Sequence, residues 1–205
     1  MAMMPPNEVG PRDTTPEGTD HTTNTSHREE AGTHDCSDTG RQLRIPELTD
    51  DVDTLTAALA YADAGWYVLP TDPAIDIKNP GTVVGKRWQA KSSRDPKQIA
   101  AWFAGTDYGI ALHAGRSGAV VFDVDDPDKL PDVLRKHLAT APFQSTRPDV
   151  PGRGHYIFLQ PPGRTIGNGT GRLGGAWGEI RGLNGVIIGA PTPHANGGRY
   201  KWVRR

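Results

Sequence analysis

The chain has 205 residues, with 23 Lys and Arg, 24 Asp and Glu and a formal net charge of −1 at pH 7. Its length is sufficient for one domain with a hydrophobic core and too short for two large domains. Its single cysteine, Cys36, excludes a disulfide framework and a cysteine-based zinc site. Because no segment resembles a secretory signal or a membrane span, we expect a cytoplasmic protein without membrane association.

Residues 1–47 differ from the rest of the chain in charge and in aromatic content. They hold nine acidic and four basic residues, a net charge of −5, whereas residues 48–205 hold fifteen acidic and nineteen basic residues, a net charge of +4. They also contain no Phe, Trp or Tyr, so they cannot bury enough apolar surface to offset chain entropy. We therefore predict a disordered acidic tail over 1–47 and a folded domain over 48–205.

The folded part begins with a predicted helix that Thr49 or Asp50 caps and that ends near Ala64, before Gly65. A strand over 66–70 follows at once. Residues 72–93 are then expected to form a polar loop. Its cationic side chains are Lys78, Lys86, Arg87 and Lys91.

The middle of the domain alternates between helix and strand patterns. Asp95 and Pro96 form a helix start, and apolar residues at helical spacing follow them. Strands are predicted over 108–112 and from Ala119 onward, and a helix is predicted from Pro127 to about Leu138.

Beyond Ala141 the pattern changes to short β segments between glycine-rich turns. The predicted strands are Phe143–Thr146, His155–Leu159, Trp177–Arg181, Val186–Ile188 and Tyr200–Val203. Helices early and strands late indicate an α+β domain with a mixed sheet and flanking helices.

The apolar run from Ala119 to Phe122 ends abruptly at Asp123, and Asp125 follows two positions later. Side chains two apart on a strand share a face, so the two carboxylates should point the same way. Because two adjacent like charges are costly without a cation, the pattern predicts a divalent metal. The alternative is that Asp125 or Asp126 only caps a helix that starts at Pro127.

Two later segments carry polar side chains that fit the same chemistry. In Gly152-Arg153-Gly154-His155 the glycines would let a phosphate approach the backbone, and His155 could donate to it; the alternative is a structural histidine. Glu179 and Arg181 share one face of a strand, where Glu179 could complete a three-carboxylate site and Arg181 could bind phosphate. The alternative for these two is an ordinary ion pair on a solvated face.

Taken together, these features resemble the bifunctional DNA primase/polymerases, the prim-pol domains of the archaeo-eukaryotic primase superfamily found on plasmids and phages. The resemblance covers residues 50–205 and lies in both the order and the type of the motifs. They are Ala60 to Pro70, Trp88, Trp102, Gly109 to Gly118, Val121-Phe122-Asp123-Val124-Asp125, Gly154-x-Tyr156-x-Phe158 with His155, Glu179-x-Arg181-Gly182, and Pro191-x-x-His194 through Tyr200-x-Trp202.

The resemblance implies a fold with an RRM-like or palm-like catalytic half and an N-terminal α/β unit. It also implies a template-directed nucleotidyl transferase that uses two Mg²⁺ or Mn²⁺ ions. Two positions depart from the family pattern. Glu179 stands where an aspartate is often found, and the interval from Ser145 to His155 is longer than a tight Ser-x-His.

The roles that we expect on this basis divide into three groups. Asp123, Asp125 and Glu179 would hold the metals and act in catalysis, while His155, Arg181 and Arg153 would bind the triphosphate. Lys86, Arg87 and Lys91 would contact template phosphates, a contribution that weakens with salt.

The implied partners are a single-stranded DNA template and NTP or dNTP. The chain has no Gly-x-x-x-x-Gly-Lys-Ser/Thr loop, so a separate helicase or primer-stabilising protein would act in trans. Three other functions remain open on the sequence: a metal-dependent sugar transferase, a metal-dependent nuclease, and a non-catalytic nucleic-acid-binding accessory module of the replication machinery.

Overall fold

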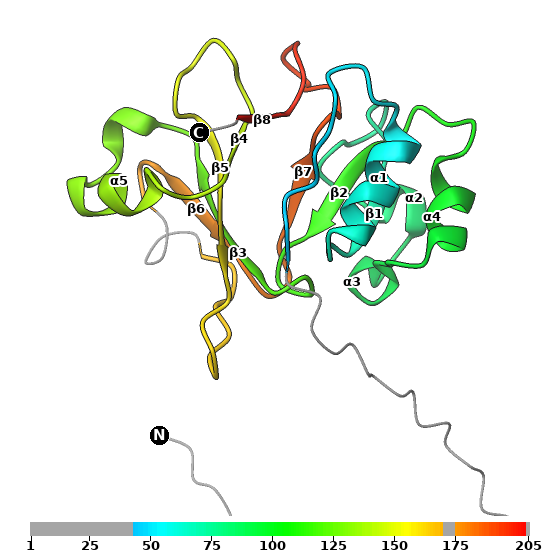
Figure 1. The fold of residues 1–205 in the computed structure, drawn as a ribbon, viewed down its shortest axis with the longest axis horizontal. Helices are drawn as coiled ribbons and strands as arrows, with labels where there is room; N and C mark the ends of the chain where they lie inside the picture. Colours follow the sequence, from blue (N-terminus) through cyan, green and yellow to red (C-terminus); the bar gives the residue numbers. More distant parts are fainter. Residues whose placement is uncertain (1–42, 170–174, 204–205) are drawn as a thin grey trace, which may run out of the picture. The chain divides into compact units, whose positions relative to one another are not determined.

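A computed structural model describes residues 43–169 and 175–203, and in them eight strands form two antiparallel sheets (Figure 1). The strands are β1 Val68–Thr71, β2 Gly109–His113, β3 Ala119–Val124, β4 Phe143–Ser145, β5 Gly154–Leu159, β6 Gly178–Arg181, β7 Val186–Gly189 and β8 Lys201–Val203. The helices are α1 Thr54–Asp63, α2 Gly81–Val84, α3 Trp88–Lys91, α4 Pro96–Phe103 and α5 Asp132–Leu138, with a 3₁₀ turn at Pro127–Lys129.

The strand order is β1-β2-β7 in the smaller sheet and β6-β3-β5-β4-β8 in the larger one. This arrangement confirms the α+β class. Every pair between the named strands is antiparallel, whereas the sequence predicted one mixed sheet. Pairing direction depends on where the connecting segments return the chain, and the residue pattern along a single strand does not encode that.

The first helix starts later than predicted. Asp53 is its N-cap, because the Asp53 carboxylate accepts from the backbone N of Thr56 at 2.9 Å. Thr49, one of the two predicted caps, instead closes a turn in which its carbonyl accepts from the N of Val52. The predicted start of α4 is confirmed, with Asp95 as its cap.

Two predicted elements are interrupted or replaced. Residues 72–93, expected as a loop, contain the short helices α2 and α3; Asn79 accepts from the N of Gly81 at 2.9 Å, and Trp88 packs against the core. The helix expected from Pro127 to Leu138 is divided, because Pro131 has no N–H to continue the ladder and α5 begins only at Asp132.

The predicted acidic tail falls on residues that the structure does not describe, except for its last five. Residues 43–47 lie along the domain: the N of Arg44 donates to the carbonyl of Ala64 at 2.9 Å, and Trp66 Nε1 donates to the Arg44 carbonyl at 2.8 Å. Leu43 and Ile45 pack against the main core. The boundary after residue 47 stays a prediction.

Strand β3 separates two hydrophobic clusters. Val120 and Val124 point to the cluster that includes Leu138 of α5, and Val121 points to the cluster beneath α1. Since side chains alternate along a strand, Asp123 shares the face of Val121 and is directed away from α5.

None of the helices in the described residues has the length and apolar character needed to span a membrane.

Candidate active site

A row of side chains crosses the larger sheet near the end of β3. Asp123 pairs in register with Glu179 of β6 on one side and with His155 of β5 on the other. Residues directly opposite each other on antiparallel strands point to the same face, with their Cβ atoms about 4.5–5.5 Å apart. The register therefore brings together three residues that are far apart in the sequence and that the sequence analysis had singled out.

Asp123 lies between two nitrogen groups. Its Oδ1 is 3.5 Å from His155 Nε2, and its Oδ2 is 3.8 Å from Arg181 Nε, while its side chain is 19% exposed. Both distances exceed a normal hydrogen bond. The carboxylate is therefore surrounded by donors without being tightly bound to either.

Arg181 joins Asp123 to the third predicted acid. Its Nη2 donates to Glu179, which is thereby turned toward the guanidinium. Arg181 Nε is buried and has no hydrogen-bond partner. An unsatisfied buried donor costs about 1–3 kcal/mol, and an oxygen of an anionic ligand would remove that cost.

Asp125 follows the end of β3 and is more exposed, with 59% of its side chain accessible. Arg153 Nη2 donates to its Oδ1 at 2.9 Å. The helix-cap alternative holds in position for one acid only: Asp126 is the N-cap residue before Pro127, although its side chain makes no capping hydrogen bond, whereas Asp125 is not a cap and faces Arg153.

One cavity of about 90 Å³ connects these groups. Of the predicted site residues, Asp123, Asp125, Arg153, His155 and Arg181 line it. Glu179 is not among the lining residues and reaches the cavity through its contact with Arg181. The remaining walls are Lys78, Thr146, Val186, Ile187, Ile188, His194 and Tyr200.

Four polar lining residues had no predicted role: Lys78, Thr146, His194 and Tyr200. Lys78 was one of several loop cations in the sequence, and nothing in the pattern distinguished it from its neighbours. His194 and Tyr200 belong to a motif quoted for the family resemblance, but the sequence analysis gave them no chemistry. Tyr200 stacks on His155, with ring centroids 5.9 Å apart, and tilts against His194 at 5.3 Å.

Burial controls the protonation states in the cavity. Burial lowers the pKa of His155 below its usual value, and the nearby Asp123 carboxylate only partly opposes this. Burial also raises the pKa of Tyr200 to about 12, with Asp123 and Asp125 adding to the rise. At neutral pH the cavity therefore presents a neutral imidazole and a protonated phenol between charged residues.

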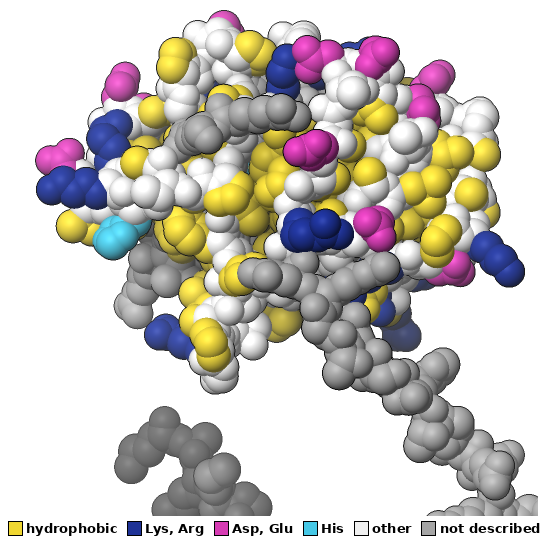
Figure 2. Space-filling model, in the orientation of Figure 1, with side chains coloured by type: hydrophobic (Ala, Val, Ile, Leu, Met, Phe, Trp, Pro, Cys, Tyr) yellow, Lys and Arg dark blue, Asp and Glu magenta, His cyan; other side chains and the backbone are white. Residues whose placement is uncertain are grey.

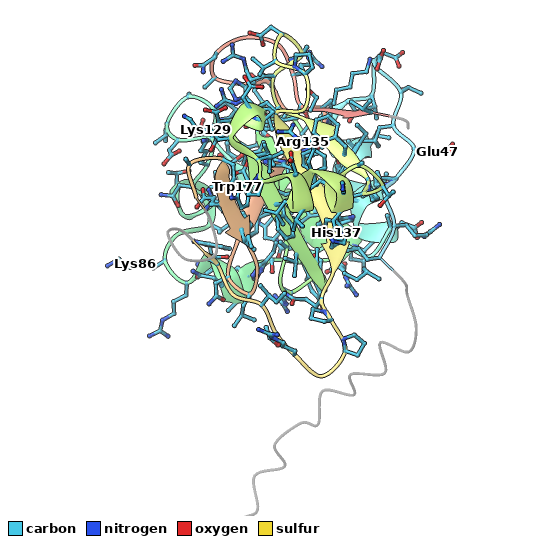
Figure 3. The ribbon with its side chains drawn as sticks, turned by 90° about the vertical axis from the view of Figure 1, so that its left-hand side faces the viewer. Glu47, Lys86, Lys129, Arg135, His137 and Trp177 are labelled. Carbon is cyan, nitrogen blue, oxygen red and sulfur yellow. The ribbon has the colours of Figure 1, made fainter. Side chains whose placement is uncertain are left out.

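The predicted template-binding cations lie elsewhere. Lys86, Arg87 and Lys91 are exposed and do not line the cavity. Figure 3 shows Lys86 extending away from the body of the molecule. On the face shown in Figure 2, Lys and Arg side chains are scattered and form no continuous basic patch.

The donor chemistry suits a divalent cation, although the acids do not converge. Carboxylate oxygens are the ligands that Mg²⁺ and Mn²⁺ prefer, and Asp123 and Asp125 line the same cavity. Glu179, however, faces Arg181, and among residues 43–169 and 175–203 no three His, Cys, Asp or Glu side chains form a metal-binding group. The residues therefore fit a metal through Asp123 and Asp125, whereas Glu179 is bound by Arg181.

In a comparison with protein families, residues 58–205 match the Prim-Pol family, described as bifunctional DNA primase/polymerase, N-terminal. No curated protein matches the chain. Because the match covers well over half of the sequence, the chain belongs to the Prim-Pol family, which supports a DNA primase/polymerase-type function with DNA and nucleotides as substrates.

Proposed function

We propose that this protein is a template-directed nucleotidyl transferase that joins NTP or dNTP to a primer end by two-metal catalysis. The observation that carries the proposal is the row of Glu179, Asp123 and His155 across β6, β3 and β5, beside a cavity that Arg153 and Arg181 also line. Carboxylates that could bind metals and donors that could bind phosphates thus lie at the same cavity.

In this proposal Asp123 and Asp125 would hold the divalent cations, with Glu179 as the third carboxylate. When bound, Mg²⁺ or Mn²⁺ lowers the pKa of the primer 3′-hydroxyl and stabilises the charge on the leaving pyrophosphate. Arg181 is bound to Glu179 in the structure. Transfer of the Arg181 guanidinium from Glu179 to a phosphate oxygen would release Glu179 for the metal.

The triphosphate would be held by His155, Arg153 and Arg181. Guanidinium groups bind phosphate through two parallel hydrogen bonds, and a neutral Nε2–H of His155 adds a directed donor. The cavity volume of about 90 Å³ is well below the 300–1,000 Å³ of whole-ligand pockets. The cavity therefore suits the phosphates, while base and sugar would lie outside it against the template.

The template strand would lie along the loop that carries Lys86, Arg87 and Lys91, whose side chains are exposed. Lys91 Nζ donates to the carbonyl of Val84 in the structure and would exchange that contact for a phosphate. Binding that depends on such contacts falls with increasing salt, so template affinity measured across a salt series tests this part. We place the enzyme in cytoplasmic replication of the plasmid or phage type, where a separate helicase or primer-stabilising protein would act with it.

Primer extension on a primed single-stranded template, with Mn²⁺ or Mg²⁺, tests the function. The Asp123→Asn/Asp125→Asn variant should extend primers about a thousandfold more slowly, because losing metal ligands removes several kcal/mol of transition-state stabilisation. The matched control is Asp128→Asn, which changes an exposed acid in the 3₁₀ turn and should keep the wild-type rate. Extension by the double variant at the wild-type rate would refute the proposal.

A non-catalytic nucleic-acid-binding module is the second candidate. It is favoured by the observation that Asp123, Asp125 and Glu179 each face an arginine, as they would in a purely structural network. Calorimetry with a deoxynucleoside triphosphate, with and without Mn²⁺, separates the two. Nucleotide binding that requires Mn²⁺ supports the enzyme, and nucleotide binding that is the same with and without Mn²⁺ supports the non-catalytic module.

A further inference from the structure

Gln144 lies behind the candidate site and belongs to none of the motifs considered above. It is in β4, is fully buried at 0% exposure and stands opposite His155 in the strand register. Each polar group of a buried amide needs a hydrogen-bond partner, because an unpaired one destabilises the folded state. The partners of Gln144 are therefore informative about what it does.

The Gln144 amide makes three hydrogen bonds. Its Oε1 accepts from the backbone N of Ala190 at 2.8 Å, and its Nε2 donates to the carbonyl of Ile188 at 2.8 Å. The remaining bond joins Nε2 to His155 Nδ1, also at 2.8 Å. Gln144 thus connects His155 to the segment around β7, which belongs to the other sheet.

The two backbone contacts determine which way the amide points. A backbone N–H can only donate and a carbonyl can only accept. Reversing the amide would place the Gln144 NH₂ against the N–H of Ala190 and its oxygen against the carbonyl of Ile188. The NH₂ group is therefore the one that faces His155.

This orientation has a consequence for the imidazole. Because Gln144 donates to Nδ1, that nitrogen must accept, and the single proton of the neutral ring then lies on Nε2. His155 Nε2 faces Asp123 Oδ1 at 3.5 Å and lines the cavity. The stacking of Tyr200 on the ring is indifferent to which nitrogen carries the proton, so it cannot replace Gln144 in this respect.

We propose that Gln144 is a positioning residue that locks His155 in the Nε2–H tautomer, so that the cavity always presents a hydrogen-bond donor to an incoming phosphate oxygen. The inference rests on the proposed function for the identity of the ligand. The other tautomer would present a lone pair to the same oxygen and repel it. The bonds to Ile188 and Ala190 also hold the imidazole at a set position relative to β7, which lines the same cavity.

The first test is ¹⁵N nuclear magnetic resonance of the wild-type full chain with labelled histidine and no nucleotide. The His155 signals are identified by their loss in His155→Ala. We expect Nδ1 to appear unprotonated and Nε2 protonated. A protonated Nδ1 in the neutral ring would overturn the proposal. This reading needs no polymerase activity, so a chain with the expected tautomer and no nucleotide incorporation would support the lock and contradict only the proposed function.

The second test is a double-mutant cycle on nucleotide incorporation. Gln144→Met keeps the length of the side chain and removes the donor, so it should raise the nucleotide KM about tenfold and change kcat much less. In a His155→Ala background the same substitution should have no further effect. An equal rise in both backgrounds would mean that Gln144 only supports the fold, and it would overturn the positioning role.

If Gln144→Met is too unstable to assay, the more conservative Gln144→Glu supplies the variant. Once ionised, the introduced carboxylate can only accept, so His155 Nδ1 should carry a proton in a protein whose new side chain is ionised by its ¹³C carboxyl resonance. A carboxyl group that stays protonated can donate as the amide does, and the proton should then remain on Nε2. An unprotonated Nδ1 beside an ionised carboxylate, or a protonated Nδ1 beside a protonated carboxyl, would contradict the proposal.

Discussion

Each of the two sheets carries a buried histidine, and the comparison between them separates structure from candidate chemistry. His113 ends β2 of the smaller sheet and is 3% exposed; His155 is in β5 of the larger sheet and is 4% exposed. Each ring has a partner at Nδ1, Ser92 Oγ at 2.9 Å and Gln144 Nε2 at 2.8 Å respectively. Up to this point the two sites are alike.

They differ at the second nitrogen. His113 Nε2 donates to the carbonyl of Leu183 at 3.2 Å, so the protein itself uses both nitrogens. His155 Nε2 faces the cavity and the carboxylate of Asp123. Burial lowers the pKa of both histidines, so neither burial nor the pKa distinguishes them. What distinguishes a candidate ligand-binding histidine here is a donor that no protein group has already satisfied.

The largest expected effect that separates the two sites comes from substituting the histidines themselves. His155→Ala should lower kcat/KM for the nucleotide by about tenfold to a hundredfold, the value of a hydrogen bond to a charged group. His113→Gln should leave kcat/KM near the wild-type value and lower the free energy of unfolding by about 1 kcal/mol, since one buried hydrogen bond is lost.

Steady-state kinetics and urea unfolding of both variants measure this pair of effects. A His113→Gln protein that is as stable as the wild type but has lost nucleotide incorporation would reverse the comparison and place the chemistry in the smaller sheet.

A smaller loss of nucleotide binding is expected from substituting Arg181, which is in β6 of the larger sheet. Arg181→Lys should raise the nucleotide KM about tenfold, because a single ammonium cannot reproduce the planar fork that faces Asp123 and Glu179. The matched control is Arg135→Lys in α5, an exposed arginine outside the cavity, which should keep the wild-type KM. Equal KM values for the two variants would exclude Arg181 from triphosphate binding.

The smallest effect concerns stability and pH, and the two sites should behave alike in it. In the unfolded chain both histidines titrate near 6.5, whereas burial lowers the pKa of both in the folded chain. Below about pH 6.5 the unfolded chain therefore takes up protons that the folded chain does not, and the free energy of unfolding falls by at most about 1.4 kcal/mol per pH unit for each histidine.

Urea unfolding between pH 5 and 7.5 measures this dependence, and His113→Gln should make it shallower. By about pH 7.5 the slope from either histidine should have fallen close to zero, because both are then nearly deprotonated in the unfolded chain as well. An identical pH dependence in wild type and His113→Gln would show that His113 does not resist protonation in the fold.

Much of the local structure followed from the sequence, because short-range chemistry determines it. The Asp95-Pro96 helix start and the strand that begins at Ala119 depend on capping and on a run of apolar residues, and both starts were predicted correctly. The loop over 72–93 was not, because its two short helices are stabilised by tertiary packing of Trp88 and by an Asn79 turn within a polar segment.

The candidate site was anticipated only for residues whose chemistry is unusual at a strand end. Asp123, His155 and Arg181 were named from their own motifs, and they share the cavity in the structure. Lys78 and Gln144 were not identified, because a loop lysine and a strand glutamine are unremarkable in sequence. Their importance depends on what they face in the folded chain.

By itself the sequence of this protein determined where carboxylates, arginines and histidines follow apolar strands, since alternation and capping act over a few residues. Only the tertiary structure decided that Glu179 stands opposite Asp123 and turns to Arg181, and that Gln144 faces His155 Nδ1. The physical reason is that strand register is a long-range property. It depends on which segments pack against each other and on which buried polar groups must find partners there.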